Sequence, residues 1–218
     1  MTSNAEIDLA SSYVRELLAV PEDRWVKADL RKSKIRLDGS ITELISFALL
    51  DAENCWNTLK HLGRGANPQL ELDRIGVTVV DAQSGLLDEH FIHFAVFVPG
   101  SRTVEQSKNA VERVKKFIFN YQLLDIVGQV DVEAVVLWHE YYHARKSECF
   151  NKNKGLPRRT MRRNQTRIQE EIGAVQFSKL AAGINYNPQI FQWMLVYTVS
   201  PMRAVKWMND IVEKDVTR

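Results

Sequence analysis

The amino-acid sequence predicts a mainly helical α+β fold with a small antiparallel sheet placed before a helix that carries two histidines. Apolar residues recur at helical spacing along most of the chain, and two β-rich runs stand between the helices. At 218 residues the chain is long enough to bury a substantial core. We expect a single domain over 1–218, with N-terminal helices at 1–63, a central part at 64–182 and C-terminal helices at 183–218.

The first part of the chain begins with a helix over 4–19. Ser3 and Glu6 have the spacing of a capping box, and apolar residues form one stripe along the helix. The following stretch, 24–38, is basic. Its last residues, 34–38, alternate between polar and apolar and predict a short strand.

A second helix is expected over 41–62 because it has the most regular apolar stripe of the chain. Ser40 and Glu43 again have capping-box spacing. The polar residues at 64–73 predict a loop after this helix.

The two β-rich runs lie at 75–80 and 91–98, and we expect them to pair as antiparallel strands. Thr103 and Gln106 then have the spacing of another capping box. They predict a helix over 104–121.

The remainder of the chain predicts helices over 132–147, 166–182, 188–198 and 201–215. The last two each begin with an Asn-Pro or Ser-Pro pair, which suits the cap and first position of a helix. The segment 151–169 has no acidic residue, and its Gly and Pro predict a loop in its first half.

Composition and charge exclude several classes of protein. The net charge is +2, so no global field favours nucleic acid. Cys55 and Cys149 are too few and too distant for a disulfide framework, which indicates a reducing compartment. The polar N-terminus shows no signal region, and the longest apolar run, 190–199, is too short to span a bilayer. We therefore expect a cytoplasmic protein without a membrane segment.

A His-Glu-x-x-His pattern lies at His139, Glu140 and His143. Histidines four residues apart share one face of a helix, so both imidazoles can bind one metal ion. The glutamate points beside that face, where it can accept a proton from water without being a ligand. The alternative is a helix with two partly buried histidines satisfied by hydrogen bonds, but the pattern favours a zinc site (Zn²⁺).

A hydrolytic zinc site needs a third protein ligand and an open position for water. Glu171 is the first candidate, because the small Ala174 follows on the same face and allows two helices to approach closely. Glu170 points about 100° away around the helix and is the alternative ligand. Both could instead be a solvated acidic pair that suits the dipole at the start of a helix.

The segment from Glu171 to Phe177 adds a resemblance to the gluzincins, zinc peptidases with a glutamate ligand on a helix after His-Glu-x-x-His. It looks like the Glu-x-x-Ala-x-x-Phe segment of ImmA/IrrE-type intracellular peptidases. The scaffold before the motif agrees with compact zincins, including the SprT-like group that acts near DNA. The resemblance covers 131–182. Val175 and Tyr142 depart from it, which leaves open what orients a histidine ligand.

The resemblance implies a zinc-dependent endopeptidase that hydrolyses a specific intracellular protein, such as a regulator. The catalytic core would be 64–182. His139, His143 and Glu171 would hold the zinc ion, and Glu140 would be the catalytic base.

Peptide hydrolysis also needs a donor for the developing oxyanion. Tyr142, Tyr186 and Tyr197 are candidates, as is an arginine of the basic segment. An extended substrate would pair with the edge of the strand at 91–98.

The segment 152–167 lies between the two expected ligand helices and is strongly basic. Arginine outnumbers lysine there, which suits carboxylate or phosphate groups. The segment is either a solvated connection or a clamp for an acidic partner or nucleic acid. Its candidate contact residues are Arg158, Arg159, Arg162 and Arg163.

Two other functions fit the same residues. One is a nucleic-acid- or partner-binding protein on a zincin scaffold, whose peptidase activity is gated or lost. The other is a zinc hydrolase that acts on a group other than a peptide. Cys149 is disfavoured as an inhibitory ligand, because it points about 240° around the helix from His143. The sequence does not determine the oligomeric state.

Overall fold

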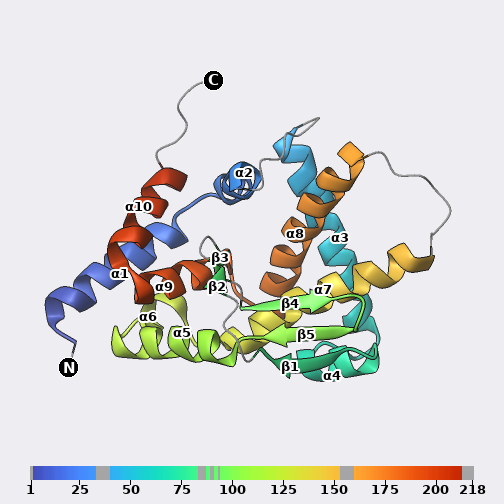
Figure 1. Ribbon diagram of the computed structural model, residues 1–218, viewed down its shortest axis with the longest axis horizontal. Helices are drawn as coiled ribbons and strands as arrows, with labels where there is room; N and C mark the ends of the chain where they lie inside the picture. The colour runs from blue at the N-terminus through green and yellow to red at the C-terminus, as the bar shows by residue number, and fades with distance from the viewer. Residues whose placement is uncertain are drawn as a thin grey trace.

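The computed structural model confirms a mainly helical α+β fold (Figure 1). The structure describes residues 2–32, 40–82, 87–88, 91–92, 94–152 and 160–212. These residues form ten helices and five short strands. The strand expected over 34–38 lies outside the described residues.

The first part of the chain forms three helices: α1 (Asn4–Leu18), α2 (Glu22–Lys32) and α3 (Ile41–His61). The capping box of α1 is confirmed, because the Glu6 amide donates to Ser3 Oγ and the Ser3 amide donates to Glu6 Oε2. The box expected for α3 is wrong, because Ser40 makes no capping hydrogen bond with its side chain.

Helix α2, and a further helix that follows α3, are not predicted by the sequence. The charged residues of α2 conceal an apolar face on which Trp25, Val26 and Leu30 are buried. The loop expected over 64–73 is wrong, because this stretch contains α4 (Pro68–Arg74). Asn67 caps α4 through its side chain and a proline occupies its first position, which are strong but easily missed signals in a polar stretch.

The main sheet has the strand order β1-β5-β4. Its strands are β1 (Thr78–Asp81), β5 (Thr103–Gln106) and β4 (Ala95–Val98). Because β5 runs parallel to β1 and antiparallel to β4, the sheet is mixed rather than antiparallel, and the two expected strands do not pair with each other. A separate antiparallel pair joins β2 (Leu87–Asp88) and β3 (Phe91–Ile92).

The central strand β5 occupies residues that the capping pattern assigned to the start of a helix. That prediction is wrong because Val104 and Gln106 alternate as buried residues on the strand. The helix begins later, as α5 (Lys108–Asn120), and its cap is Ser107, whose side chain accepts from the Ala110 amide.

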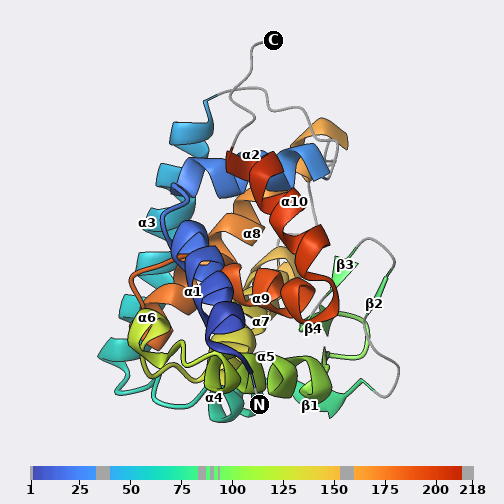
Figure 2. The same ribbon diagram turned by 90° about the vertical axis from the view of Figure 1, so that its left-hand side faces the viewer.

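Five helices complete the chain: α6 (Leu124–Val127), α7 (Val132–Lys152), α8 (Thr160–Ala182), α9 (Ile190–Val199) and α10 (Pro201–Val212). Helix α7 contacts β4 and α4, and α8 packs against both α7 and α3 (Figure 1). Helices α1, α5 and α10 all pack against α9 (Figure 2). Helix α7 thus lies between the sheet and the rest of the helical layer.

An aromatic cluster holds α3, α7 and α8 together. Trp138 and Tyr141 of α7 lie with ring centroids 5.9 Å and 5.8 Å from that of Phe177 on α8. Trp56 of α3 meets both Trp138 and Phe177 at 6.1 Å. Such contacts add to burial and fix how the helices cross.

Among the described residues, no helix combines the length and apolar character needed to cross a membrane.

Candidate metal centre

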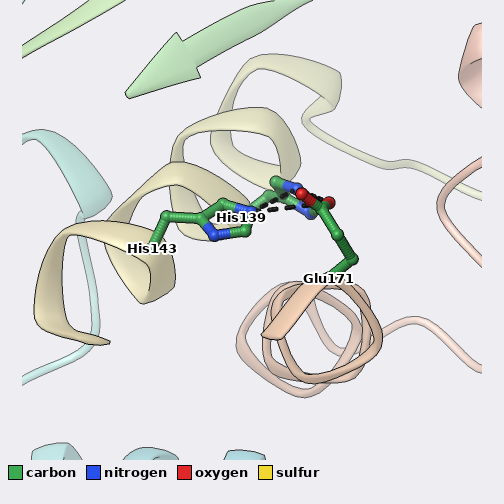
Figure 3. Close-up of side chains that lie close together, drawn as sticks. All are labelled: His139, His143 and Glu171. Atoms are coloured by element: carbon green, nitrogen blue, oxygen red, sulfur yellow. Dashed lines mark hydrogen bonds and ion pairs between the residues drawn. The ribbon is translucent and has the colours of Figure 1, made fainter. Parts of the chain in front are cut away.

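Helices α7 and α8 bring together the three side chains predicted as metal ligands (Figure 3). The Nε2 atoms of His139 and His143 are 3.1 Å apart. Each lies 3.6 Å from Glu171 Oε2. Tetrahedral ligands with metal bonds of about 2.0–2.1 Å are separated by about 3.3 Å, so these spacings fit a zinc ion.

The arrangement follows from the local sequence. Because α7 is continuous, His139 and His143 lie on one face, one turn apart. Glu171 comes from α8, which crosses α7 at the aromatic cluster. The side chains of His139, His143 and Glu171 are 26%, 15% and 42% exposed, so the site is partly shielded but open to a substrate.

Glu170 contacts the other nitrogen of one histidine ligand. Its Oε1 lies 2.9 Å from His143 Nδ1, while His143 Nε2 faces the remaining candidate ligands. The structure therefore places Glu171, rather than the alternative Glu170, with the two ε nitrogens. A carboxylate on the free nitrogen fixes the tautomer and the ring orientation of a ligating histidine. Glu170 supplies the orienting group that the departure at Val175 left unidentified.

The charges in this cluster stabilise one another. Burial opposes the charged form of His143, but hydrogen bonds with Glu170 and Glu171 raise its pKa well above the usual value. Burial also opposes the charged form of Glu171, yet its contacts with His139 and His143 lower its pKa well below the usual value. The side chains are therefore organised around a positive charge, which a proton or a metal ion can provide.

Glu140 is buried beside the cluster and is held by the sheet. Its side-chain Oε2 accepts a hydrogen bond of 2.7 Å from the Phe97 amide of β4. β4 is an edge strand of the main sheet, and this amide points away from its partner β5. The carboxylate predicted as the catalytic base is therefore fixed between α7 and the edge of the sheet.

The three candidate tyrosines lie away from the cluster. The Tyr142 hydroxyl donates to Asp51 of α3, and Tyr186 donates to the Val127 carbonyl at 2.9 Å. Tyr197 packs its ring against Tyr13, with centroids 4.8 Å apart. None of the three lines the described cleft at the metal site, so the structure does not support them as oxyanion donors.

A cleft of about 420 Å³ contains the candidate metal centre. One part of its wall is apolar: Phe94 lies just before β4, and α7, α8 and α9 contribute Val135, Val136, Val175 and Phe191. Its polar wall includes three residues that sequence reasoning did not single out as site residues, namely Asp29, Arg167 and Gln192. Arg167 could have been found, because it precedes Glu171 by one helical turn.

The other basic candidates are placed less fully. Arg158 and Arg159 lie outside the described residues. Arg162 and Arg163 belong to the first turn of α8, and Cys149 belongs to α7. The clamp formed by the segment 152–167 stays a prediction.

Comparisons with models of protein families, with curated proteins and with solved structures find no match to this chain. The resemblance to gluzincins therefore rests on the motif residues.

Proposed function

We propose that this chain is a zinc-dependent endopeptidase that cleaves a protein substrate in the cytoplasm. The observation that carries the proposal is the joint geometry of α7, α8 and β4. Three ligand atoms have tetrahedral spacing, and a buried carboxylate next to them is held by a strand edge. A helix with two structural histidines would need neither Glu171 at both ε nitrogens nor an open cleft.

In this proposal His139, His143 and Glu171 hold the zinc ion, and Glu170 orients His143. Bound zinc lowers the pKa of water and polarises the scissile carbonyl. Glu140 accepts the proton of the attacking water and returns it to the leaving amine. The Phe97 amide keeps the Glu140 carboxylate in place between these two transfers.

The edge of β4 supports a peptide rather than another substrate class. Residues Phe94 to Phe97 line the cleft, and one side of β4 has no neighbouring strand among the described residues. An extended peptide can add to such an edge through main-chain groups other than the Phe97 amide, which is already bonded to Glu140. The apolar wall next to the edge would then receive an apolar side chain of the substrate.

The experiment compares the wild-type chain with Glu140→Gln, both loaded with zinc, on a mixture of unfolded proteins. We expect cleavage by the wild type and a loss of about 10²–10⁴-fold in the variant, with the zinc content unchanged. Arg113→Ala, which removes an exposed charge on α5, is the matched control. A zinc-loaded wild type that cleaves no protein, or cleavage that survives in Glu140→Gln, would contradict the proposal.

A further inference from the structure

Among the described residues, Arg167 is the one lysine or arginine side chain that lines the metal cleft. Its side chain is exposed and forms no hydrogen bond or ion pair with any residue that the structure describes. It is the last of the seven basic residues of the segment 152–167, and it lies on α8. One positive charge of this basic segment therefore lies at the candidate active site.

Arg167 stands close to where a substrate would react. It precedes Glu171 by four residues on α8, which is about 6 Å along the helix axis. Ser147 of α7 also lines the cleft and follows His143 by the same interval. Both residues lie toward the ends of α7 and α8 that the residues 153–159 connect. Ser147 and Arg167 give this part of the cleft polar groups beside the apolar Ile168, whereas Val135 and Val175 line it in the opposite direction along the two helices.

The acidic groups of the cleft already have partners, in contrast to Arg167. Glu140 accepts from the Phe97 amide, and Glu170 and Glu171 contact the histidines. Asp29 accepts a 2.8 Å hydrogen bond from Gln189 Nε2. Arg167 is therefore the charged side chain of the described cleft wall that has no partner among the described residues, and the group that pairs with it must be an anion.

We propose that the substrate carries an aspartate or glutamate near the scissile bond and that Arg167 binds this carboxylate. The inference rests on the proposed peptidase function and names its substrate class. The planar guanidinium matches a carboxylate with two parallel hydrogen bonds. A nucleic-acid backbone is the weaker fit, because it would need several cations along its path and the described cleft wall offers one.

The test is a fluorogenic peptide library in which Asp, Asn or Lys is placed at each position within three residues of the cleaved bond. We expect the zinc-loaded wild type to favour Asp over Asn at one position. Arg167→Ala lowers kcat/KM for the Asp peptides about tenfold to a hundredfold and leaves the Asn peptides nearly unchanged. Arg167→Lys keeps part of the preference, and Arg167→Glu shifts it toward Lys. Zinc content is measured in every variant, and Arg113→Ala on α5 is the control.

Two results separate this inference from the proposed function. Cleavage without any preference for Asp, or a preference that persists in Arg167→Ala and Arg167→Glu, overturns the role of Arg167 and leaves the peptidase in place. If no peptide is cleaved, the proposed function fails, and calorimetry with acetyl-Asp-Leu and acetyl-Asn-Leu hydroxamates then decides the binding of the carboxylate. Equal affinities for the two hydroxamates would overturn it. An Arg167→Ala variant that loses affinity for a DNA oligonucleotide, with peptide preference unchanged, would also overturn it.

Discussion

Helix α7 has two faces with different surroundings. One face carries His139, Glu140 and His143 toward the cleft, where the histidine side chains are 26% and 15% exposed. The other buries Trp138 and Tyr141 against Phe177 of α8. The first face has polar groups arranged around a positive charge, and the second has rings fixed by packing. The comparison indicates that packing of the aromatic face fixes α7 against α8, and that this packing keeps the polar side chains of the metal centre in position.

The aromatic face also fixes the distance between the helices. A Cβ atom on Gly173 of α8 would lie 2.3 Å from the Tyr142 hydroxyl, so the phenol occupies the space that a side chain would need. Asp51 of α3 accepts a hydrogen bond from Tyr142 and pairs with Lys146. Gly173 follows Glu171 by two residues, so the spacing at this contact determines how far Glu171 reaches toward the histidines.

The largest expected effect separates the two faces directly. Trp138→Ala should lower the free energy of unfolding of the metal-free chain by about 3–5 kcal/mol, because it leaves a cavity in the aromatic cluster. His139→Ala should lower it by less than about 1 kcal/mol, because its side chain is partly exposed. Urea unfolding followed by circular dichroism measures both. Equal losses in the two variants would break the distinction between the faces.

A change at the helix contact should affect both faces. Gly173→Ala places a methyl group against the buried Tyr142 ring, and overpacking of this kind costs about 1–3 kcal/mol. It should also weaken zinc binding, since α8 must move away from α7. Unfolding and zinc titration measure the two effects. The control is Ala182→Gly at the end of α8. Gly183→Ala is unsuitable as a control, because Gly183 has a positive φ of 66° that alanine adopts only with strain. Zinc affinity that is unchanged in Gly173→Ala would show that the contact does not set the spacing.

Glu170 offers a change confined to the polar face. Glu170→Ala should weaken zinc binding about tenfold to a hundredfold, because His143 loses the group that orients its ring. Zinc affinity is measured by competition with a chelator of known affinity. Glu133→Ala removes a half-buried carboxylate in the first turn of α7, which pairs with Lys115 away from the metal centre, and is the control. A variant that loses its zinc entirely would instead make Glu170 a ligand.

The smallest expected effect, per pH unit, is the change of zinc affinity with pH. The pKa of His143 is raised well above its usual value, so below that pKa the metal-free imidazole carries a proton that zinc must displace. Zinc affinity should therefore rise about tenfold per pH unit up to this pKa and level off above it. Calorimetry in two buffers with different ionisation enthalpies measures the released proton. Affinity independent of pH between 5 and 7 would contradict a protonated His143.

The two faces also show what the sequence can predict. His139 and His143 are four residues apart on one helix, so local periodicity predicts their shared face without knowledge of the fold. The reach of Glu171 was predicted from the small Ala174 on the same stripe. The role of Glu170 was not, because it depends on how α8 crosses α7, and that crossing is set by aromatic residues distant in sequence.

The sheet shows most clearly which parts of the fold local sequence cannot predict. The two strands at its edges were predicted from their β-branched and aromatic residues, but the central strand β5 was assigned to a helix. Its four residues carry a capping spacing that is local, whereas their pairing with β1 and β4 is not. Helix α2 is not predicted for a related reason. Its sequence is dominated by charged residues, and only the packed structure shows that Trp25 and Leu30 are buried beneath them.

The most direct test of the central claim is the zinc content of the purified chain, measured by elemental analysis after zinc is supplied and excess is removed. The wild type should hold one zinc ion per chain, and His139→Ala and Glu171→Ala should both lose it while they remain folded by circular dichroism. No zinc in the wild type would contradict the claim that α7 and α8 form a metal centre. Zinc retained in both variants would place any metal elsewhere in the chain.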